Sequence, residues 1–217
     1  MKMNVKKMVL MAMLSAVAYL LVCLIHIPVI PILPFLQYEP KDVVITIGGF
    51  LLGPMTAFIC SLVVSLVEMV TISTTGPIGC IMNLLSTCSF ACVAALIYKK
   101  RHSINGAVVG LLAGSVAMVV MMLLWNWLIT PMYMGYPREA VEALLIPGFL
   151  PFNLLKAGFN TALTLMLYKP LVSALRRTGL VSASSAPKRQ SKIGIYLVGA
   201  VLLATCILLL LVLQGKI

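Results

Sequence analysis

Long apolar segments without charge, separated by short basic clusters, are the feature of this chain that most restricts its fold. The run from Ile146 to Tyr168 contains one charged residue, Lys156, and the run from Ile193 to Leu213 contains none. About 20 such residues cross the hydrocarbon core of a bilayer as a helix. Lipid offers no partners to backbone polar groups, so segments of this kind form helices. The sequence therefore predicts an all-α, polytopic membrane protein.

Composition and charge support this class and exclude nucleic-acid binding. Charged residues make up 10% of the chain, whereas they approach about a quarter of a soluble domain. The net charge of +11 comes from clusters of Lys and Arg beside apolar segments. By the positive-inside rule, such clusters are expected on the cytoplasmic side of a membrane. The clusters are Lys2, Lys6 and Lys7; Lys99 to Arg101; Arg176 and Arg177; and Lys188, Arg189 and Lys192.

The same rule predicts the number of crossings. With the N-terminus in the cytoplasm and Lys99 also inside, residues 43–98 must cross the membrane an odd number of times, and their length favours three short crossings. Breaks are expected at Gly53-Pro54 and Gly76-Pro77. Residues 104–129 then lead out and residues 148–168 lead back, which completes six helices around one compact body.

Three parts of the chain follow from this count. Residues 1–177 form the six-helix substrate-binding membrane domain, and residues 178–192 form a basic, Ser/Ala-rich cytoplasmic linker. Residues 193–217 are predicted to carry a seventh transmembrane helix, which would place Lys216 outside. Because every candidate ligand residue precedes Tyr168, we expect this last helix to contribute nothing to binding.

Lys156 is a lone cation in the middle of a spanning segment. Placing a charge at that depth costs about 2.5–3.5 kcal/mol on insertion scales, so such residues usually face a partner or a water-filled cavity. Asn153 and Asn160 lie three residues before and four residues after it, on the same side of a helix. This polar stripe predicts one wall of a solute-binding site.

Other polar residues suggest further walls, with alternatives left open. Glu68 could pair with Lys156, either at a ligand or as a purely structural ion pair. Asn126 lies in an aromatic segment near the outer surface, and its amide offers a donor and an acceptor suited to the imide edge of a pyrimidine-type ring. The proline-rich loop of residues 28–41 could be a lid over the site or a rigid connector.

The sequence lacks the residue motifs that common enzyme classes require. The zinc-hydrolase, nucleophile-elbow and P-loop motifs do not occur. Six scattered cysteines show no zinc-type spacing, so we expect no catalytic residues, no metal site and no cofactor. With few acidic residues in the membrane, ion-coupled transport is also disfavoured. A binding subunit driven by the ATPase of another protein fits better.

Several motifs together resemble a known family. They are Tyr38 to Asp42 leading into Gly53-Pro54; Gly76 to Gly79 followed by Asn83; Asn126 with Pro131 and Tyr133; and Pro151 to Asn153 with Lys156. Over about residues 8–177 the chain resembles the riboflavin-specific S component of energy-coupling factor (ECF) vitamin transporters. The usual six-helix body of that family lacks the segment from Ile193 to Leu213.

The resemblance implies capture of riboflavin from the extracellular side and ATP-driven uptake across a bacterial cell membrane. The partners it implies are an ECF transmembrane coupling subunit and two ATPase subunits. Ala12 and Ala16, a small-residue pair on the first helix, would form the docking face for the coupling subunit. Alternatives are an S component for thiamin, flavin mononucleotide or a nucleoside-like compound, or, from a different class, an intramembrane enzyme or assembly factor.

The resemblance also implies a set of ligand residues. Positions like Asn126, Asn153 and Lys156 bind the flavin in that family, with Lys156 acting as a hydrogen-bond donor because the flavin is uncharged. Trp127, Phe152 and Tyr133 would cover the apolar ring surface. Further candidates are Glu68, Tyr38 and Asn83.

Overall fold

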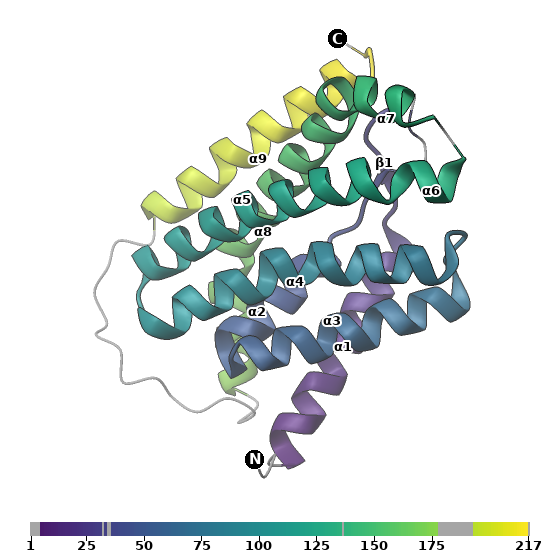
Figure 1. Cartoon of the computed structure of the whole chain (residues 1–217). Helices are drawn as coiled ribbons and strands as arrows, with labels where there is room; N and C mark the ends of the chain where they lie inside the picture. The colour runs from purple at the N-terminus through teal and green to yellow at the C-terminus, as the bar shows by residue number, and fades with distance from the viewer. Residues whose placement is uncertain (1–4, 32, 34–35, 136, 178–192, 217) are drawn as a thin grey trace.

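The structure, a computed structural model, describes residues 5–31, 33, 36–135, 137–177 and 193–216. Its long helices pack into one bundle (Figure 1). They are α1 (Val5–Leu24), α2 (Lys41–Leu52), α3 (Pro54–Thr71), α4 (Gly76–Lys100), α5 (Ile104–Leu128), α8 (Leu150–Arg177) and α9 (Ile193–Leu213). The predicted all-α membrane fold, a six-helix body with an additional C-terminal helix, is confirmed.

The two expected Gly-Pro breaks are present. Helix α2 ends at Leu52, Gly53 adopts a φ of 101°, and Pro54 opens α3. A positive φ is accessible to glycine without steric cost, and proline fits the first turn of a helix because its missing N–H has no partner there. The third helix of this region, α4, likewise begins at Gly76-Pro77.

Helix α2 differs from the other long helices because it is too short to cross a membrane alone. Its 12 residues span about 18 Å at 1.5 Å per residue, whereas six segments of the described chain, including the C-terminal one, are long and apolar enough to cross. All of its residues from Lys41 to Phe50 are buried. It packs against α1, α3, α4 and α8.

The connections at one end of the bundle are structured. Two short strands, β1 (Ile27–Pro28) and β2 (Gln37–Tyr38), pair as a small antiparallel hairpin. The segment expected as an external loop before α8 contains α6 (Thr130–Met134), α7 (Arg138–Leu144) and the π-helical turn η1 (Leu145–Phe149).

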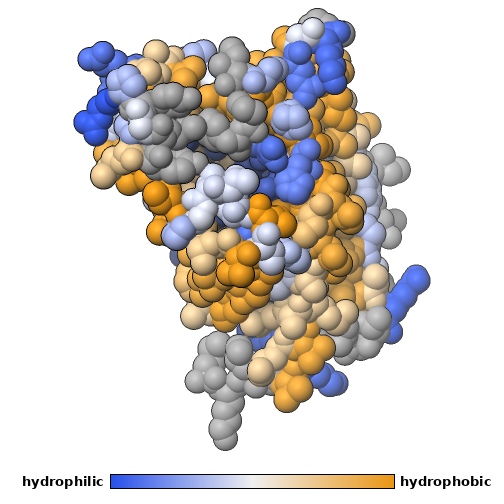
Figure 2. Space-filling view, turned by 90° about the vertical axis from the view of Figure 1, so that its right-hand side faces the viewer, coloured by the Kyte–Doolittle hydropathy of each residue, from blue (hydrophilic) through white to orange (hydrophobic). Residues whose placement is uncertain are grey.

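Helix α9 lies along α8, with its C-terminal end near α7 and the hairpin (Figure 1). The N-terminal end of α1 and the C-terminal end of α9 are at opposite ends of the molecule (Figure 1). The predicted linker of residues 178–192 lies outside the described residues. Hydrophilic residues gather within an otherwise largely apolar face in Figure 2.

Candidate functional site

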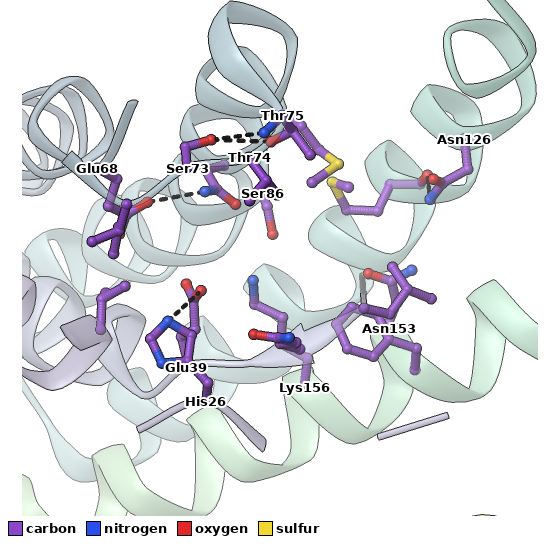
Figure 3. A pocket seen from close by; sticks show the side chains of 18 of the residues that line it. His26, Glu39, Glu68, Ser73, Thr74, Thr75, Ser86, Asn126, Asn153 and Lys156 are labelled. Carbon is purple, nitrogen blue, oxygen red and sulfur yellow. Dashed lines mark hydrogen bonds and ion pairs between the residues drawn. The ribbon is translucent and has the colours of Figure 1, made fainter. Parts of the chain in front are cut away.

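A cavity of about 240 Å³ lies between the hairpin and α3, α4, α5 and α8. Polar side chains from all of these elements point into it (Figure 3). Its polar lining consists of His26, Gln37, Glu39, Glu68, Ser73, Thr74, Thr75, Asn83, Ser86, Asn126, Thr130, Asn153 and Lys156. Apolar surface comes from Val22, Leu36, Ile72, Met82, Met122 and Phe152. The structure thus brings Asn126, Asn153, Lys156, Glu68 and Asn83, all predicted from the sequence, to one cavity.

The two asparagines each use part of their amide to hold their own orientation. Asn126 Nδ2 donates to the Met122 carbonyl at 2.7 Å, and its Oδ1 accepts from the Thr130 hydroxyl at 3.0 Å. Asn153 Nδ2 donates to the Phe149 carbonyl at 2.7 Å. One N–H of each amide and the Asn153 Oδ1 stay available to a ligand, because an amide has two donors and an acceptor oxygen. Two oriented amides on α5 and α8 can therefore read a planar polar edge.

Lys156 is held beside a buried carboxylate. Its Nζ lies 3.6 Å from Asp42 Oδ2, and Asp42 is fully buried. Asp42 also accepts hydrogen bonds from Thr87 Oγ1 at 2.7 Å and from Asn160 Nδ2 at 3.0 Å. These bonds fix the carboxylate, and a fixed carboxylate compensates a buried ammonium. Donors of Lys156 that do not face Asp42 can reach a ligand.

A second ion pair closes the cavity on the α3 side. Lys41 Nζ lies 2.6 and 2.7 Å from the two Glu68 oxygens and 2.9 Å from Glu39 Oε2. Asn83 Nδ2 donates to Glu68 Oε2 at 2.9 Å. Lys41 is only 1% exposed, so its charge depends on these two carboxylates. His26 Nε2 lies 3.9 Å from Glu39 Oε1 at the edge of the group.

The structure settles the pairing of Glu68, which the sequence left open. Glu68 pairs with Lys41 and Lys156 pairs with Asp42, so each lysine is bound to a different carboxylate. Lys41 and Asp42 were assigned to the external loop, whereas they form the first turn of α2 inside the bundle. The sequence gives a weak signal for this, because both directly precede the uncharged run from Val43 to Leu52.

The placement of Tyr38 also corrects an expectation. In β2, Gln37 faces the cavity and Tyr38 points to the opposite side, as alternation along a strand requires. The Tyr38 hydroxyl donates to Asn160 Oδ1 at 3.1 Å, and its ring lies 5.0 Å from that of Phe159. Tyr38 and Asn160 thus support the Asp42 carboxylate from behind the cavity.

The aromatic residues predicted to cover a ligand ring do not all line the cavity. Trp127 does not line the cavity: it donates to Glu142 Oε1 at 2.9 Å and lies under the Arg138 guanidinium. Phe152 does line the cavity. Tyr133 is in α6, and its side chain lies outside the described part of the structure.

The hydroxyl groups of the turn between α3 and α4 were missed by sequence reasoning. Ser73, Thr74 and Thr75 line the cavity, and Ser73 Oγ lies 3.1 Å from Thr75 Oγ1. Their only sequence signal is a cluster of polar residues before Gly76-Pro77, which is equally typical of an ordinary turn.

The chemistry of the cavity suits binding. Amides, hydroxyls and an ammonium converge on it from several helices, next to Phe152 and the apolar side chains of Met82 and Met122. Small-molecule sites combine apolar walls with a few oriented polar groups in this way. Across the described ranges, no group of three or more His, Cys, Asp or Glu side chains is placed to hold a metal ion.

Comparison with known proteins identifies the family. The family model of the ECF transporter substrate-specific component matches residues 6–168. The chain belongs to this family. The match confirms the resemblance noted in the sequence and assigns the chain to a class of multi-pass transport proteins and not to an enzyme class. The family model ends before α9 begins.

Curated relatives and a solved structure agree with this assignment. The riboflavin transporter RibU of Staphylococcus aureus is 27% identical over 79% of this chain and 93% of its own length. The riboflavin transporter FmnP of Bacillus subtilis is 27% identical over 80% of this chain and 97% of its own. A solved S component of a bacterial ECF transporter superposes with a TM-score of 0.67 at 28% identity, covering 79% of this chain and 98% of that one.

Proposed function

We propose that this chain captures riboflavin from the extracellular side of a bacterial cell membrane and delivers it to the cytoplasm with ECF partner subunits. The observation that carries the proposal is the convergence of Asn126, Asn153 and Lys156, from two helices, on one cavity. Two relatives that match this chain over nearly their whole length are named riboflavin transporters, which supports the choice of ligand.

Each group has a role in this proposal. The free N–H of Asn126 and the amide of Asn153 read the imide edge of the pyrimidine ring. Lys156 donates a hydrogen bond to the ligand. It does not serve as a counter-ion of the ligand, because Asp42 already balances its charge. Phe152 covers part of the flat ring. The hydroxyls of Ser73 to Thr75, with Asn83 and Glu68, supply partners for a polyol chain.

Selectivity follows from these buried polar groups. A ligand without matching donors and acceptors leaves them unpaired, and each unpaired buried group costs about 1–3 kcal/mol. This disfavours thiamin, whose ring system presents a different pattern of donors and acceptors. Flavin mononucleotide shares the flavin ring and differs only at the end of the polyol chain.

Transport requires partners in this proposal. A transmembrane coupling subunit and two ATPase subunits supply the energy, as expected for an ECF S component. Ala12 and Ala16 are exposed on the outer side of α1, while Leu14, Ser15 and Ala18 of the same helix face the bundle. The two alanines are therefore accessible to another helix. The N-terminus of α1 lies on the cytoplasmic side.

The first test is the visible spectrum of the purified protein. Co-purified riboflavin makes the sample yellow, and denaturation releases a flavin that chromatography identifies. Titration of ligand-free protein with riboflavin, flavin mononucleotide and thiamin then compares the candidate ligands. Tight binding of thiamin together with no binding of either flavin would contradict the proposal.

A further inference from the structure

Helix α9, which lies beyond the family match, reaches the loop that covers the cavity. Gln214, just after the end of α9, donates from Nε2 to the Pro28 carbonyl at 2.7 Å. Leu210 and Leu213 pack against the apolar cluster that contains Val29, Ile30, Leu33 and Leu36. The hydrogen bond joins the end of α9 to the loop whose described residues are 27–31, 33 and 36–39, which we call the roof loop, and the two leucines pack against a cluster to which this loop contributes.

The roof loop forms one side of the proposed binding site. Leu36, Gln37 and Glu39 line the cavity, and Glu39 is also bound to Lys41 at the start of α2. The loop holds its own shape through hydrogen bonds from Val29 N to the Leu36 carbonyl and from Leu36 N to the Leu33 carbonyl. A shift of this loop therefore changes the cavity directly.

The cavity is small for a flavin-sized ligand. Its volume of about 240 Å³ is below the roughly 300–1,000 Å³ typical of small-molecule sites. Most of the other lining residues belong to helices that are packed against one another, while Ser73, Thr74 and Thr75 belong to the turn between α3 and α4. Displacement of the roof loop would enlarge the cavity for a flavin-sized ligand, and contacts that hold this loop would slow entry and release.

Close packing on α8 determines where the end of α9 lies. A methyl group added at Gly199 of α9 would lie 2.8 Å from Met166 Cγ, and one added at Gly158 of α8 would lie 2.5 Å from Cys206 Sγ. Each glycine thus accommodates a side chain of the other helix, which lets the helices approach closely and fixes their register. This register brings Gln214 to Pro28.

We propose that α9 is a clasp for the roof loop, with Gln214 as a positioning residue that sets the rate of ligand exchange. The clasp lies outside the cavity and touches no ligand, so it acts through the loop alone. This inference goes beyond ligand capture and rests on the proposed function only for the choice of ligand.

Gln214→Glu in the full-length protein tests the clasp, because it keeps the size of the side chain and removes the N–H donor. Losing one such hydrogen bond corresponds to a factor of about 3 to 10 in an equilibrium constant. We expect riboflavin to dissociate about threefold to tenfold faster, with a smaller change in affinity because association also speeds up. In ligand-free protein, hydrogen exchange at the Val29, Leu33 and Leu36 amides should rise by a similar factor.

Two control variants distinguish the clasp from general damage to α9. Gln214→Lys restores an N–H donor and should return both rates to those of the wild type. Thr205→Val removes another polar group of α9, one that bonds only to the Val201 carbonyl, and should leave both rates unchanged. Hydrogen exchange and ligand dissociation in Gln214→Glu equal to wild type would overturn the clasp, as would an equal effect of Thr205→Val. If the wild type binds no riboflavin, the proposed ligand is wrong, and the exchange measurement still tests the clasp.

Discussion

Two ion pairs at the cavity each join a lysine to a carboxylate on another helix. Lys156 of α8 faces Asp42 of α2, and Lys41 of α2 faces Glu68 of α3. A buried charge without its partner is strongly destabilising, so these pairs specify how the three helices meet. They also leave the cavity without an uncompensated cation, which suits an uncharged ligand.

Removing Lys41 should test the structural part of this network. In Lys41→Met, Glu68 and Glu39 keep their negative charges beside one another without the ammonium. Breaking a buried pair in this way typically costs about 3–5 kcal/mol. We expect a clear fall in the thermal unfolding midpoint of the detergent-purified protein, measured by the fluorescence of its tryptophans.

The double variant Lys41→Met with Glu68→Gln is the matched control. It removes the uncompensated charge on α3 and keeps the hydrogen-bonding capacity toward Asn83, so it should recover much of the lost stability. If the double variant unfolds at the same temperature as Lys41→Met alone, the Lys41 and Glu68 charges are not coupled as the distances indicate.

At this scale the sequence was most informative where a polar residue interrupts an apolar run. Lys156, Asn126 and Asn153 were recognised in this way, and all three line the cavity. Lys41 and Asp42 were missed because Pro40 and Glu39 precede them, so that charge and proline together indicated a loop. Burial of a charged first turn depends on the neighbouring helices, and the local pattern indicates it only weakly.

Among the elements, α9 shows that a mostly aliphatic helix can still pack at one specific position. Its outer residues, such as Val201 and Leu208, are exposed, while Cys206 is buried against α8. Gly199→Leu should push α9 away from Met166 and expose Cys206. We expect faster alkylation of Cys206 by a membrane-permeant maleimide, followed by peptide mass spectrometry.

Gly194→Leu provides the matched control for this prediction. A side chain added at Gly194 meets nothing within 4 Å, so α9 should stay in place and Cys206 should stay protected. Equal protection of Cys206 in both variants would mean that the glycine does not determine the packing of α9 on α8.

The sequence predicted which helices exist and where they begin and end better than it predicted how they pack. The breaks at Gly53-Pro54 and Gly76-Pro77 and the span from Ile193 to Leu213 all agree with the observed helices. The packing partner of α9 could not be predicted, because a helix that is apolar all round has no face that differs from the others. The sequence predicted no role for α9 in binding because every candidate ligand residue precedes Tyr168. In the structure no residue of α9 is among those that line the cavity, and Gln214 at its end bonds to the roof loop.

For the whole molecule, binding and transport should be separable at α1. Small side chains at Ala12 and Ala16 allow another helix to approach closely, and tryptophan at both positions would block that approach by steric bulk. The double variant should bind riboflavin normally when purified and should lose uptake and co-purification in cells that supply the ATPase partners. Normal uptake with the partners attached would show that this face contacts lipid only.

The orientation of the chain gives a second prediction at this scale. Gln214 bonds to Pro28, so Lys216 lies on the same side as the roof loop, at the end of the molecule opposite the start of α1. With a cytoplasmic start of α1, this side would be external. A cysteine introduced at position 216, in a background without the exposed Cys23, should react with an impermeant maleimide added to intact cells. A cysteine at position 100, at the opposite end of α4, should react only after permeabilisation. The reverse pattern would invert the proposed topology.

The most direct test of the central claim is calorimetric titration of riboflavin into ligand-free wild type, Lys156→Met, Asn126→Ala and the exposed control Leu154→Ala. A hydrogen bond from a charged donor contributes about 1.5–3 kcal/mol, which corresponds to a factor of roughly 10 to 150 in affinity. We predict at least tenfold weaker binding in Lys156→Met, severalfold weaker binding in Asn126→Ala, and unchanged binding in Leu154→Ala. Wild-type affinity in both cavity variants would contradict the account, because riboflavin would then bind elsewhere.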